Sequence, residues 1–393
     1  MPNKILCRFG ELSTKQGNRN EFIKLLKKNI QVALREFDSI EIKRTFDRLI
    51  ISYDDIDEQA IIDILKTVFG LSSFSIIRAM DLDMDAIISF IIEQMMQKAP
   101  SKFKVYSRRL NKSFQYTSDD INRMVATSIL KNTEHVVDVH QPEIKIRIEC
   151  KHHQAFVSLE TYRGPMGMPV RMAGKGLLLL SGGFDSPVAG YLANKRGIEY
   201  AAIHFETVPF TSLKATDKVL KLAQKLSLYQ NSTQVLVVPF AKVQMVINET
   251  VPESYRITIM RRMMVRIANQ LADTVYASVL ITGESVGQVA SQTLSSMIRI
   301  DEVSEKMIVR PLVTYDKDEI IDIARKVDTY DLSILPFDDC CTVFTPAHPI
   351  TNPLKEKTER FESFGEYEAV IADAIKHTKY YKINKSKIIE EQE

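Results

Sequence analysis

The chain has 393 residues, of which 45% are hydrophobic and 26% are charged, and its formal net charge is +2. This length allows two or three domains with their own cores, and the composition is ordinary for a soluble globular protein, so any basic surface must be local. The longest near-apolar stretch, 86–92, is too short to span a bilayer, and residues 1–15 lack the apolar core of a signal peptide. Four cysteines without a CxxC pair exclude a disulfide framework and argue against zinc. We therefore expect a cytoplasmic protein with reduced thiols.

The first 75 residues alternate short strand and helix patterns. Strands are predicted at 4–9, 38–44, 47–53 and 74–80, and helices at 20–37 and 57–69. This β-α-β-β-α-β order is typical of a ferredoxin-like unit.

A second block follows, with a predicted helix at 83–97 and strand-like segments at 144–150 and 154–162. Between Ser101 and Ser118 there is no acidic residue, whereas aromatic residues alternate with the basic residues Lys102, Lys104, Arg108, Arg109 and Lys112. Basic side chains neutralise phosphates and exposed aromatic rings stack on unpaired bases, which favours RNA binding. Composition supports equally a strand whose aromatic side chains face the core while its lysines are merely solvated.

A Gly/Pro-rich linker at 164–176 precedes alternating strands and helices up to about residue 330, the pattern of a doubly wound parallel sheet. Four leucines at 177–180 without polar alternation indicate a parallel strand buried on both faces. The next helix has Pro187 in its first turn and ends before Gly197. Residues 181–186, SGGFDS, therefore lie at the carboxyl end of a central strand, where open α/β sheets bind ligands.

This loop has the chemistry of a phosphate site. Gly182 and Gly183 let the backbone approach an anion closely, and the N-terminus of the following helix favours negative charge. Ser181 and Ser186 add hydroxyl donors, while Asp185 can hold Mg²⁺ or position the turn. No GK[ST] follows, so the loop is not a Walker A motif. It resembles instead the pyrophosphate loop (PP-loop) of N-type ATP pyrophosphatases.

Further segments of the same sheet support a nucleotide site. His204 and Phe205 end the second predicted strand, and residues 279–294 read as a strand, a glycine turn and a helix. A helix at 258–273 carries Arg261, Arg262 and Arg266, but its periodicity leaves open which arginine faces a triphosphate. A core stripe with a solvated basic face is the alternative for this helix.

Six segments together resemble the tRNA 4-thiouridine synthetase (tRNA sulfurtransferase) family. They are RFGELSTKQGNR (8–19), YSRRLNKSF (106–114), LSGGFDSPVAG (180–190), TGESVGQVASQT (282–293), RPLVTYDKDEI (310–320) and DDCCTVFTP (338–346). The resemblance implies a ferredoxin-like domain at 1–75, a THUMP RNA-binding domain at 76–165 and a PP-loop ATP pyrophosphatase domain at 166–393. It is to the short form, without a C-terminal rhodanese-like domain. The implied activity is ATP-dependent transfer of sulfur to the uridine at position eight of tRNA, giving 4-thiouridine and releasing AMP and pyrophosphate.

The resemblance also implies a set of site residues and partners. ATP, with Mg²⁺, would be bound by Leu179, Leu180, Ser181, Gly182, Gly183, Asp185, Ser186, His204, Phe205, Arg261, Gly283 and Gln292. One difference is Phe184, where many members have isoleucine, a conservative change that leaves the phosphate donors intact. Lys15 and Arg19 join the basic residues named above as tRNA contacts. Implied partners are tRNA, a cysteine desulfurase as sulfur donor and, in some members, the sulfur-carrier protein of thiamine thiazole synthesis. The oligomeric state stays open, a homodimer being one option.

The adjacent Cys340 and Cys341 are the candidate sulfur carriers. A buried cysteine pair is usually small apolar filler, but Pro336 and two aspartates favour a loop here. Sulfur transfer needs an exposed thiolate, and alignment on the following Thr-Val-Phe matches Cys341 to the family's catalytic cysteine, with Cys340 as the second candidate. Whether Cys340 resolves the reaction through a neighbouring disulfide, or sulfide is released instead, stays open. Cys7 and Cys150 lie in predicted strands and are interpreted as structural.

Two other functions stay open at this stage. Another PP-loop adenylating enzyme, of the amidotransferase or ligase type, would not explain the RNA-binding pattern or the cysteine pair. A non-catalytic tRNA-binding protein would not explain the intact SGGFDS loop.

Overall fold

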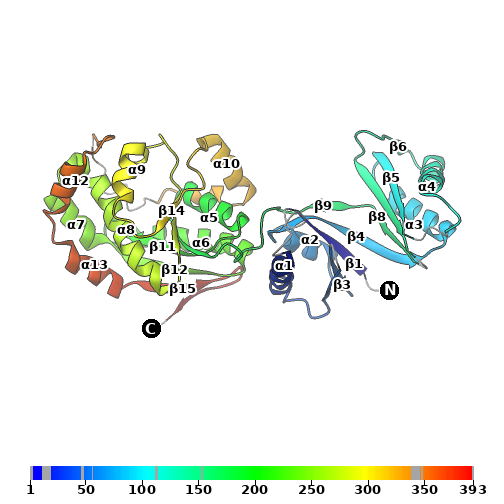
Figure 1. Cartoon of the computed structure of the whole chain (residues 1–393), viewed down its shortest axis with the longest axis horizontal. Helices are drawn as coiled ribbons and strands as arrows, with labels where there is room; N and C mark the ends of the chain where they lie inside the picture. The colour runs from blue at the N-terminus through cyan, green and yellow to red at the C-terminus, as the bar shows by residue number, and fades with distance from the viewer. Residues whose placement is uncertain are drawn as a thin grey trace. The chain divides into compact units, whose positions relative to one another are not determined.

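The computed structural model describes residues 3–10, 19–45, 48–54, 56–110, 114–151, 154–337, 346 and 348–391. The chain divides into two compact units, Met1–Gly167 and Met168–Glu393, and each is described by itself (Figure 1). Lys15, Lys112, Cys340 and Cys341 lie outside the described residues.

The described strands of the first unit form one sheet with the order β2-β3-β1-β4-β8-β7-β5-β6, and β9 pairs with β4. The strands are β1 (Asn3–Phe9), β2 (Glu41–Arg44), β3 (Arg48–Tyr53), β4 (Leu71–Asp81), β5 (Lys102–Arg109), β6 (Val136–Val137), β7 (Ile144–Cys150), β8 (Gln154–Ser158) and β9 (Thr161–Arg163). The helices are α1 (Arg19–Ala33), α2 (Glu58–Leu65), α3 (Met84–Met96) and α4 (Ser118–Asn132). The β-α-β-β-α-β order predicted for residues 1–75 is therefore present, although the first helix ends at Ala33 rather than at residue 37.

Strand β4 belongs to both halves of this sheet. Residues 71–77 pair with β1, with Lys4 opposite Ile77, whereas residues 78–81 pair with β8, with Arg78 opposite Val157. The strand is longer than the predicted 74–80 because it continues from the ferredoxin-like part into the following part without a linker.

Helices α3 and α4 pack on one face of β5, β7 and β8. Ile87 and Ile91 of α3 and Val125 of α4 share a core with Phe103 and Ile146 of the sheet. Because successive side chains of a strand point to opposite faces, Lys104, Tyr106 and Arg147 lie on the other face of β5 and β7.

The second unit is built on a sheet with the order β14-β13-β10-β11-β12-β15-β16. The strands are β10 (Lys175–Leu179), β11 (Glu199–Glu206), β12 (Thr233–Pro239), β13 (Val279–Ile281), β14 (Met307–Val309), β15 (Lys379–Ile383) and β16 (Ile388–Glu391). The first five run parallel, as predicted, and β15 and β16 add an antiparallel hairpin that the sequence did not indicate. The strand order reverses between β10 and β13, which is where ligands bind in open α/β sheets.

Helices cover both faces of this sheet. The helices are α5 (Asp185–Lys195), α6 (Leu213–Gln230), α7 (Ala241–Thr250), α8 (Arg256–Thr274), α9 (Leu294–Asp301), α10 (Lys317–Lys326), α11 (Tyr330–Ser333), α12 (Lys355–Glu362) and α13 (Tyr367–Lys376). One core joins α7, α8 and α13 to alternate strand residues such as Leu177 and Leu236. On the opposite face α5 packs closely, since a Cβ on Gly190 would lie 2.8 Å from Leu178 Cδ2. The predicted doubly wound arrangement is confirmed.

Candidate active site

A cavity of about 710 Å³ lies at the carboxyl ends of β10, β11 and β13. Eleven of the twelve residues predicted to bind ATP line it, namely Leu179, Leu180, Ser181, Gly183, Asp185, Ser186, His204, Phe205, Arg261, Gly283 and Gln292. Gly182 is not among the lining residues but belongs to the same turn. The structure therefore brings together residues from four separate segments of the sequence, and their role in ATP binding stays a prediction.

The SGGFDS turn is closed by its two serines. The Ser181 amide donates to Ser186 Oγ at 2.9 Å, and the two hydroxyl oxygens lie 3.1 Å apart. Helix α5 begins at Asp185, and its N-cap residue Phe184 makes no side-chain capping hydrogen bond. The first-turn amides of α5 therefore remain suited to an anion such as a phosphate.

Asp185 and Gln292 each present a buried polar atom to the cavity. Asp185 Oδ1 and Gln292 Oε1 are buried and have no hydrogen-bond partner among the described residues. Burial raises the pKa of Asp185 to about 6, although the positive charge of Lys317 opposes this rise. Since buried oxygen atoms without partners are costly, both atoms indicate that a ligand completes the site.

Gly283 permits the closest contact in the site. A Cβ at this position would lie 2.6 Å from the amide nitrogen of Ser186 and 2.7 Å from the carbonyl carbon of Asp185. The turn after β13 therefore packs directly against the first turn of α5, and only glycine fits there.

The structure distinguishes the three arginines of α8. Arg261 lines the cavity, where its Nη2 donates to Glu284 Oε1 at 2.9 Å. Arg262 and Arg266 both bind Glu362 of α12 instead. Arg261 is thus the candidate for the phosphates of a nucleotide, as the resemblance implied.

The segment after Gly283 is not a helix. The chain turns at Gly287, whose φ is 85°, and its amide donates to the Gln292 carbonyl at 2.9 Å. A short 3₁₀ turn, η3 (Ala290–Gln292), follows before α9 begins at Leu294. Positive φ favours glycine and interrupts helical geometry, which explains why the predicted helix is absent here.

Two charged residues of the site were missed by the sequence analysis. Lys317 begins α10, and its charge acts on the Asp185 carboxyl group. Glu284 lines the cavity with only 4% of its side chain exposed. Both lie within segments that carry the family resemblance, and a charged residue directly after the glycine turn was the available signal for Glu284.

The segment that leads to the cysteine pair is anchored by Lys218 of α6. This buried ammonium group donates to the main-chain carbonyl oxygens of Ser333 at 3.4 Å, Leu335 at 3.1 Å and Phe337 at 3.2 Å. The other two cysteines, Cys7 and Cys150, are buried in β1 and β7 as predicted. Burial raises the pKa of the Cys7 thiol to about 12, against the opposing charge of Arg8, and burial also raises the pKa of Cys150. Neither is suited to act as a thiolate nucleophile.

The basic segment of the first unit divides between core and surface. Phe103 is fully buried, whereas Lys104 Nζ lies 4.7 Å from the ring centroid of Tyr106 and the Arg147 guanidinium 5.5 Å from it. Lys102 pairs with Asp138 at 3.2 Å, Arg109 donates to the Phe114 carbonyl at 3.1 Å, and Arg108 is exposed. Arg19 is the first residue of α1. Alternate residues of β5 therefore face the core and the opposite surface, and RNA binding by the surface residues stays a prediction.

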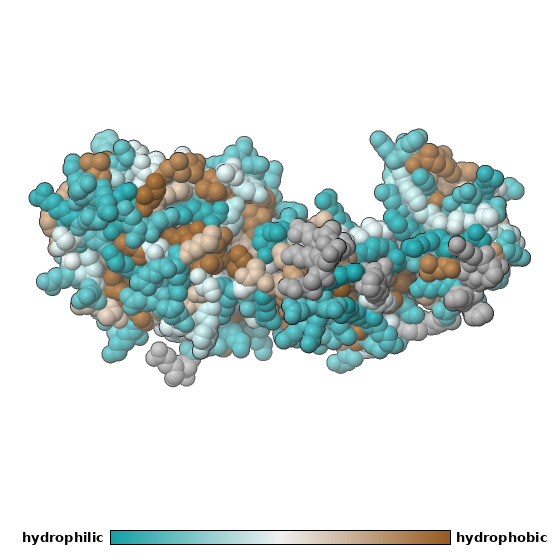
Figure 2. Space-filling model, in the orientation of Figure 1, coloured by the Kyte–Doolittle hydropathy of each residue, from teal (hydrophilic) through white to brown (hydrophobic). Residues whose placement is uncertain are grey.

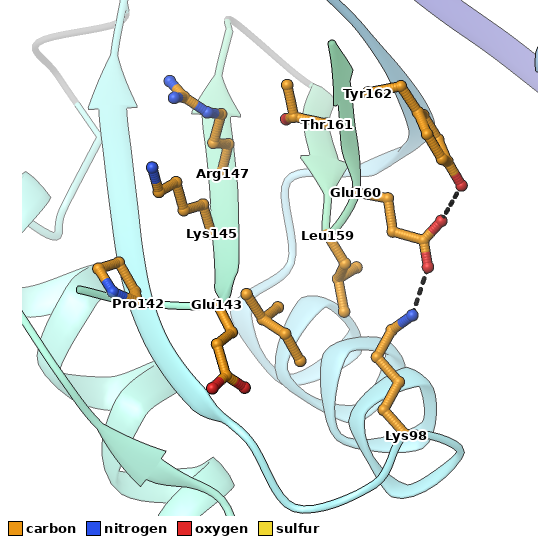
Figure 3. A pocket seen from close by; sticks show the side chains of 10 residues that line it. Lys98, Pro142, Glu143, Lys145, Arg147, Leu159, Glu160, Thr161 and Tyr162 are labelled. Atoms are coloured by element: carbon orange, nitrogen blue, oxygen red, sulfur yellow. Dashed lines mark hydrogen bonds and ion pairs between the residues drawn. The ribbon is translucent and has the colours of Figure 1, made fainter. Parts of the chain in front are cut away.

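A second cavity, of about 440 Å³, adjoins this surface. Figure 3 shows Lys145 and Arg147 projecting from β7 on one side, and Glu160 bound by Lys98 and Tyr162 on the other. Lys145 and Arg147 bring two positive charges to a cavity that Glu143 and the engaged Glu160 also line. These two cations lie on β7, beside the basic residues of β5.

The visible surface is mainly hydrophilic with separate hydrophobic patches (Figure 2). One patch is on α9, where Leu294 and Ile298 are 63% and 53% exposed.

Within the described ranges, no helix is long and apolar enough to cross a membrane. No group of three or more His, Cys, Asp or Glu residues in the same ranges is arranged to hold a metal ion.

Three family models match the chain. The model described as thiamine biosynthesis protein (ThiI) matches residues 171–366, the ThiI ferredoxin-like domain matches 4–75, and the THUMP domain matches 83–160. These matches confirm the predicted fold class.

Individual relatives agree with the family models. A protein of Brevibacillus brevis named probable tRNA sulfurtransferase is 44% identical over 382 residues, covering 96% of this chain and 96% of the relative. A protein of Bacillus pumilus with the same name is 43% identical and covers 94% of this chain and 93% of the relative. A solved structure, a 4-thiouridine synthetase–RNA complex with bound ATP, superposes with a TM-score of 0.89 at 30% identity, covering 98% of this chain and all of that one.

Proposed function

Because this chain belongs to the ThiI family of tRNA sulfurtransferases, we propose that it adenylates the uridine at position eight of tRNA and replaces its O4 with sulfur, giving 4-thiouridine. The observation that carries the proposal is the cavity at the strand-order reversal, lined by the SGGFDS turn and holding two buried oxygen atoms without partners among the described residues. We propose that the reaction takes place in the cytoplasm.

ATP is the first substrate. The uracil O4 attacks the α-phosphorus and pyrophosphate leaves, so that a poor leaving group, the carbonyl oxygen, is converted into AMP. The α5 N-terminus with the Ser181 and Ser186 hydroxyls holds the phosphates, and Arg261 and Lys317 add positive charge. Charge placed around the phosphates before reaction stabilises the transition state.

Asp185 fits a magnesium ion that accompanies ATP. Its Oδ1 is buried without a partner among the described residues, and carboxylate oxygens are ligands that Mg²⁺ accepts. The ion would neutralise phosphate charge when bound. Asp185 must be ionised for this role. Burial raises its pKa and so disfavours the carboxylate, whereas the positive charge of Lys317 favours it.

Sulfur enters in the second step, for which we propose a persulfide on Cys341 formed by a cysteine desulfurase. The terminal sulfur bonds to C4 as AMP leaves. A second thiol, from Cys340 or from an external reductant, then attacks the Cys341 sulfur; a disulfide forms and the 4-thiouridine is freed. Lys218 supports this proposal because it fixes the backbone up to Phe337, three residues before the pair.

We propose that the chain has a ferredoxin-like domain at 1–75, a THUMP domain at 76–165 and a PP-loop domain at 166–393, and that the first two bind tRNA. Support comes from the Lys104–Tyr106–Arg147 cluster, together with Lys102, Arg108 and Arg109 on β5 and Lys112 shortly after it in the sequence. Lys15 and Arg19, in the ferredoxin-like part, are proposed as further tRNA contacts. A homodimer is proposed as well, since the exposed Leu294 and Ile298 offer apolar surface; light scattering of the purified chain tests it.

Nucleoside analysis tests the function directly. tRNA incubated with the protein, ATP, Mg²⁺, cysteine and a cysteine desulfurase is expected to contain 4-thiouridine, and pyrophosphate release is expected to require tRNA. Pyrophosphate release without tRNA would favour another PP-loop enzyme, and tRNA binding without release would favour a non-catalytic RNA-binding protein.

Sulfur transfer to the carrier protein of thiamine thiazole synthesis is the second candidate function. It is favoured by the description of the family model that matches residues 171–366. Formation of a thiocarboxylate on the carrier, measured by mass spectrometry with the same desulfurase, tests it separately from tRNA.

A further inference from the structure

We propose that Glu284 is a positioning residue for ATP, which holds the Arg261 guanidinium in the cavity where the phosphates bind. The inference rests on the proposed function, because it assumes that ATP occupies this cavity. It adds that Glu284 should strengthen binding of the phosphates of ATP without affecting binding of the nucleoside.

Both carboxylate oxygens of Glu284 are already engaged. Oε1 accepts from Arg261 Nη2 at 2.9 Å. Oε2 accepts from Arg310 Nε at 2.8 Å and from the Thr282 hydroxyl at 2.9 Å. Arg310 continues the chain to Asp301 of α9, with Nη1 donating to Oδ2 at 2.9 Å. A carboxylate with this many donors is fixed in orientation and therefore fixes its partners.

Glu284 is a negatively charged residue in a cavity proposed to bind phosphates, and its neighbours account for its presence there. Glu284 directly follows Gly283, which packs against the Ser186 amide at the start of α5. An unpaired carboxylate there would repel a triphosphate, but Glu284 lies between two arginines. Its function is thus to orient positive charge beside the loop.

The electrostatics agree with this assignment. Burial of Glu284 opposes ionisation, but the charges of Arg261 and Arg310 and the hydrogen bonds from Thr282 and Arg310 outweigh it and hold the pKa of Glu284 below its usual value. The carboxylate therefore stays ionised around neutral pH and is not available as a proton donor. A buried charge of this kind is retained only with such partners.

Helix α8, which carries Arg261, offers a matched control through its other two arginines. Glu362 of α12 bridges Arg262, at 2.6 Å, and Arg266, at 2.7 Å, and 13% of its side chain is exposed. Neither Glu362 nor these two arginines line the cavity. Glu362→Gln thus removes a partly buried carboxylate that bridges two arginines of α8, without touching the proposed phosphate site.

The experiment measures the affinities of the full chain for ATP with Mg²⁺ and for adenosine by isothermal titration calorimetry. Glu284→Gln leaves one carbonyl oxygen for two arginines, so ATP affinity is expected to fall about tenfold or more, whereas adenosine affinity stays within about twofold. Glu362→Gln should change neither affinity. In an Arg261→Gln background, Glu284→Gln should have no further effect on ATP, because the residue acts through Arg261.

The outcomes separate this inference from the proposed function. Equal losses for ATP and adenosine, or additive losses in the Arg261→Gln background, would overturn the positioning role. If Glu284→Gln fails to fold, Glu284→Asp keeps the charge but withdraws the carboxylate from Arg261 and should give the same selective loss; unchanged ATP affinity would refute the inference. A wild-type chain that does not bind ATP would instead overturn the proposed function, and this inference with it.

Discussion

We expect the ionised Asp185 carboxylate to lower the free energy of unfolding while it supports activity. Asp185→Asn should therefore be more stable than wild type but inactive. The pKa of the carboxyl group is raised by burial from 3.8 to about 6, so the folded state favours the protonated form. Ionisation therefore costs stability: the loss develops as the pH rises from about 3.8 to about 6 and persists above that window. Asparagine carries no charge and avoids the loss.

The magnitude follows from the shift. The difference between the two pKa values corresponds to at most ~3 kcal/mol, and partial access of water to the side chain reduces this to about 1–2 kcal/mol. Asp185→Asn should thus be more stable than wild type by about this amount at pH 8, with the difference nearly gone at about pH 4. The same variant should lose tRNA-dependent pyrophosphate release, while tRNA binding stays nearly unchanged.

Urea unfolding followed by hydrogen exchange in β10 and α5 measures this effect in the second unit alone. The matched control is Asp373→Asn on α13, because the Lys242 hydrogen bond holds the pKa of Asp373 below its usual value and the substitution should be destabilising at pH 8. An equal gain for Asp185→Asn at pH 4 and pH 8, or no gain at pH 8, would refute the reasoning. Normal pyrophosphate release by the variant would contradict the assignment of the loop.

Three further predictions concern the glycine turn, the RNA surface and the sulfur carrier. Gly283→Ala should cost about 1–3 kcal/mol of unfolding free energy and most of the adenylation activity, since its Cβ would lie 2.6 Å from the Ser186 nitrogen; Gly183→Ala, with its nearest neighbour at 3.7 Å, should melt like wild type. Alanine at Lys104, Arg108 and Arg109 should weaken tRNA binding and lower its log–log salt slope by about one per lost phosphate contact, with ATP binding unchanged; an unchanged slope would mean a merely solvated face. Cys341→Ser should block 4-thiouridine formation but not pyrophosphate release, and an active Cys341→Ser beside an inactive Cys340→Ser would reverse the assignment within the pair.

The phosphate loop could be predicted from local sequence because its determinants are local. The buried leucine strand, the glycine pair and Pro187 specify strand, turn and helix within about ten residues. The periodicity of α8 could not identify its cavity-facing arginine, which only the family resemblance implied, because the choice depends on Glu362, a residue about a hundred positions away that binds the other two. The helix expected after Gly283 was wrong for a related reason: the backbone at Gly287 folds back to Gln292, a turn that the periodicity does not report.

Strand β4 has a consequence for how the RNA-binding unit can be divided. The two family models end at residue 75 and begin at residue 83, but β4 runs from Leu71 to Asp81 across that gap and pairs with β1 and β8. A break at this boundary would leave unpaired strand edges on both fragments, which promotes aggregation. Genetic exchange of one part without the other is therefore disfavoured, and the two are expected to be inherited together and to unfold as one cooperative block.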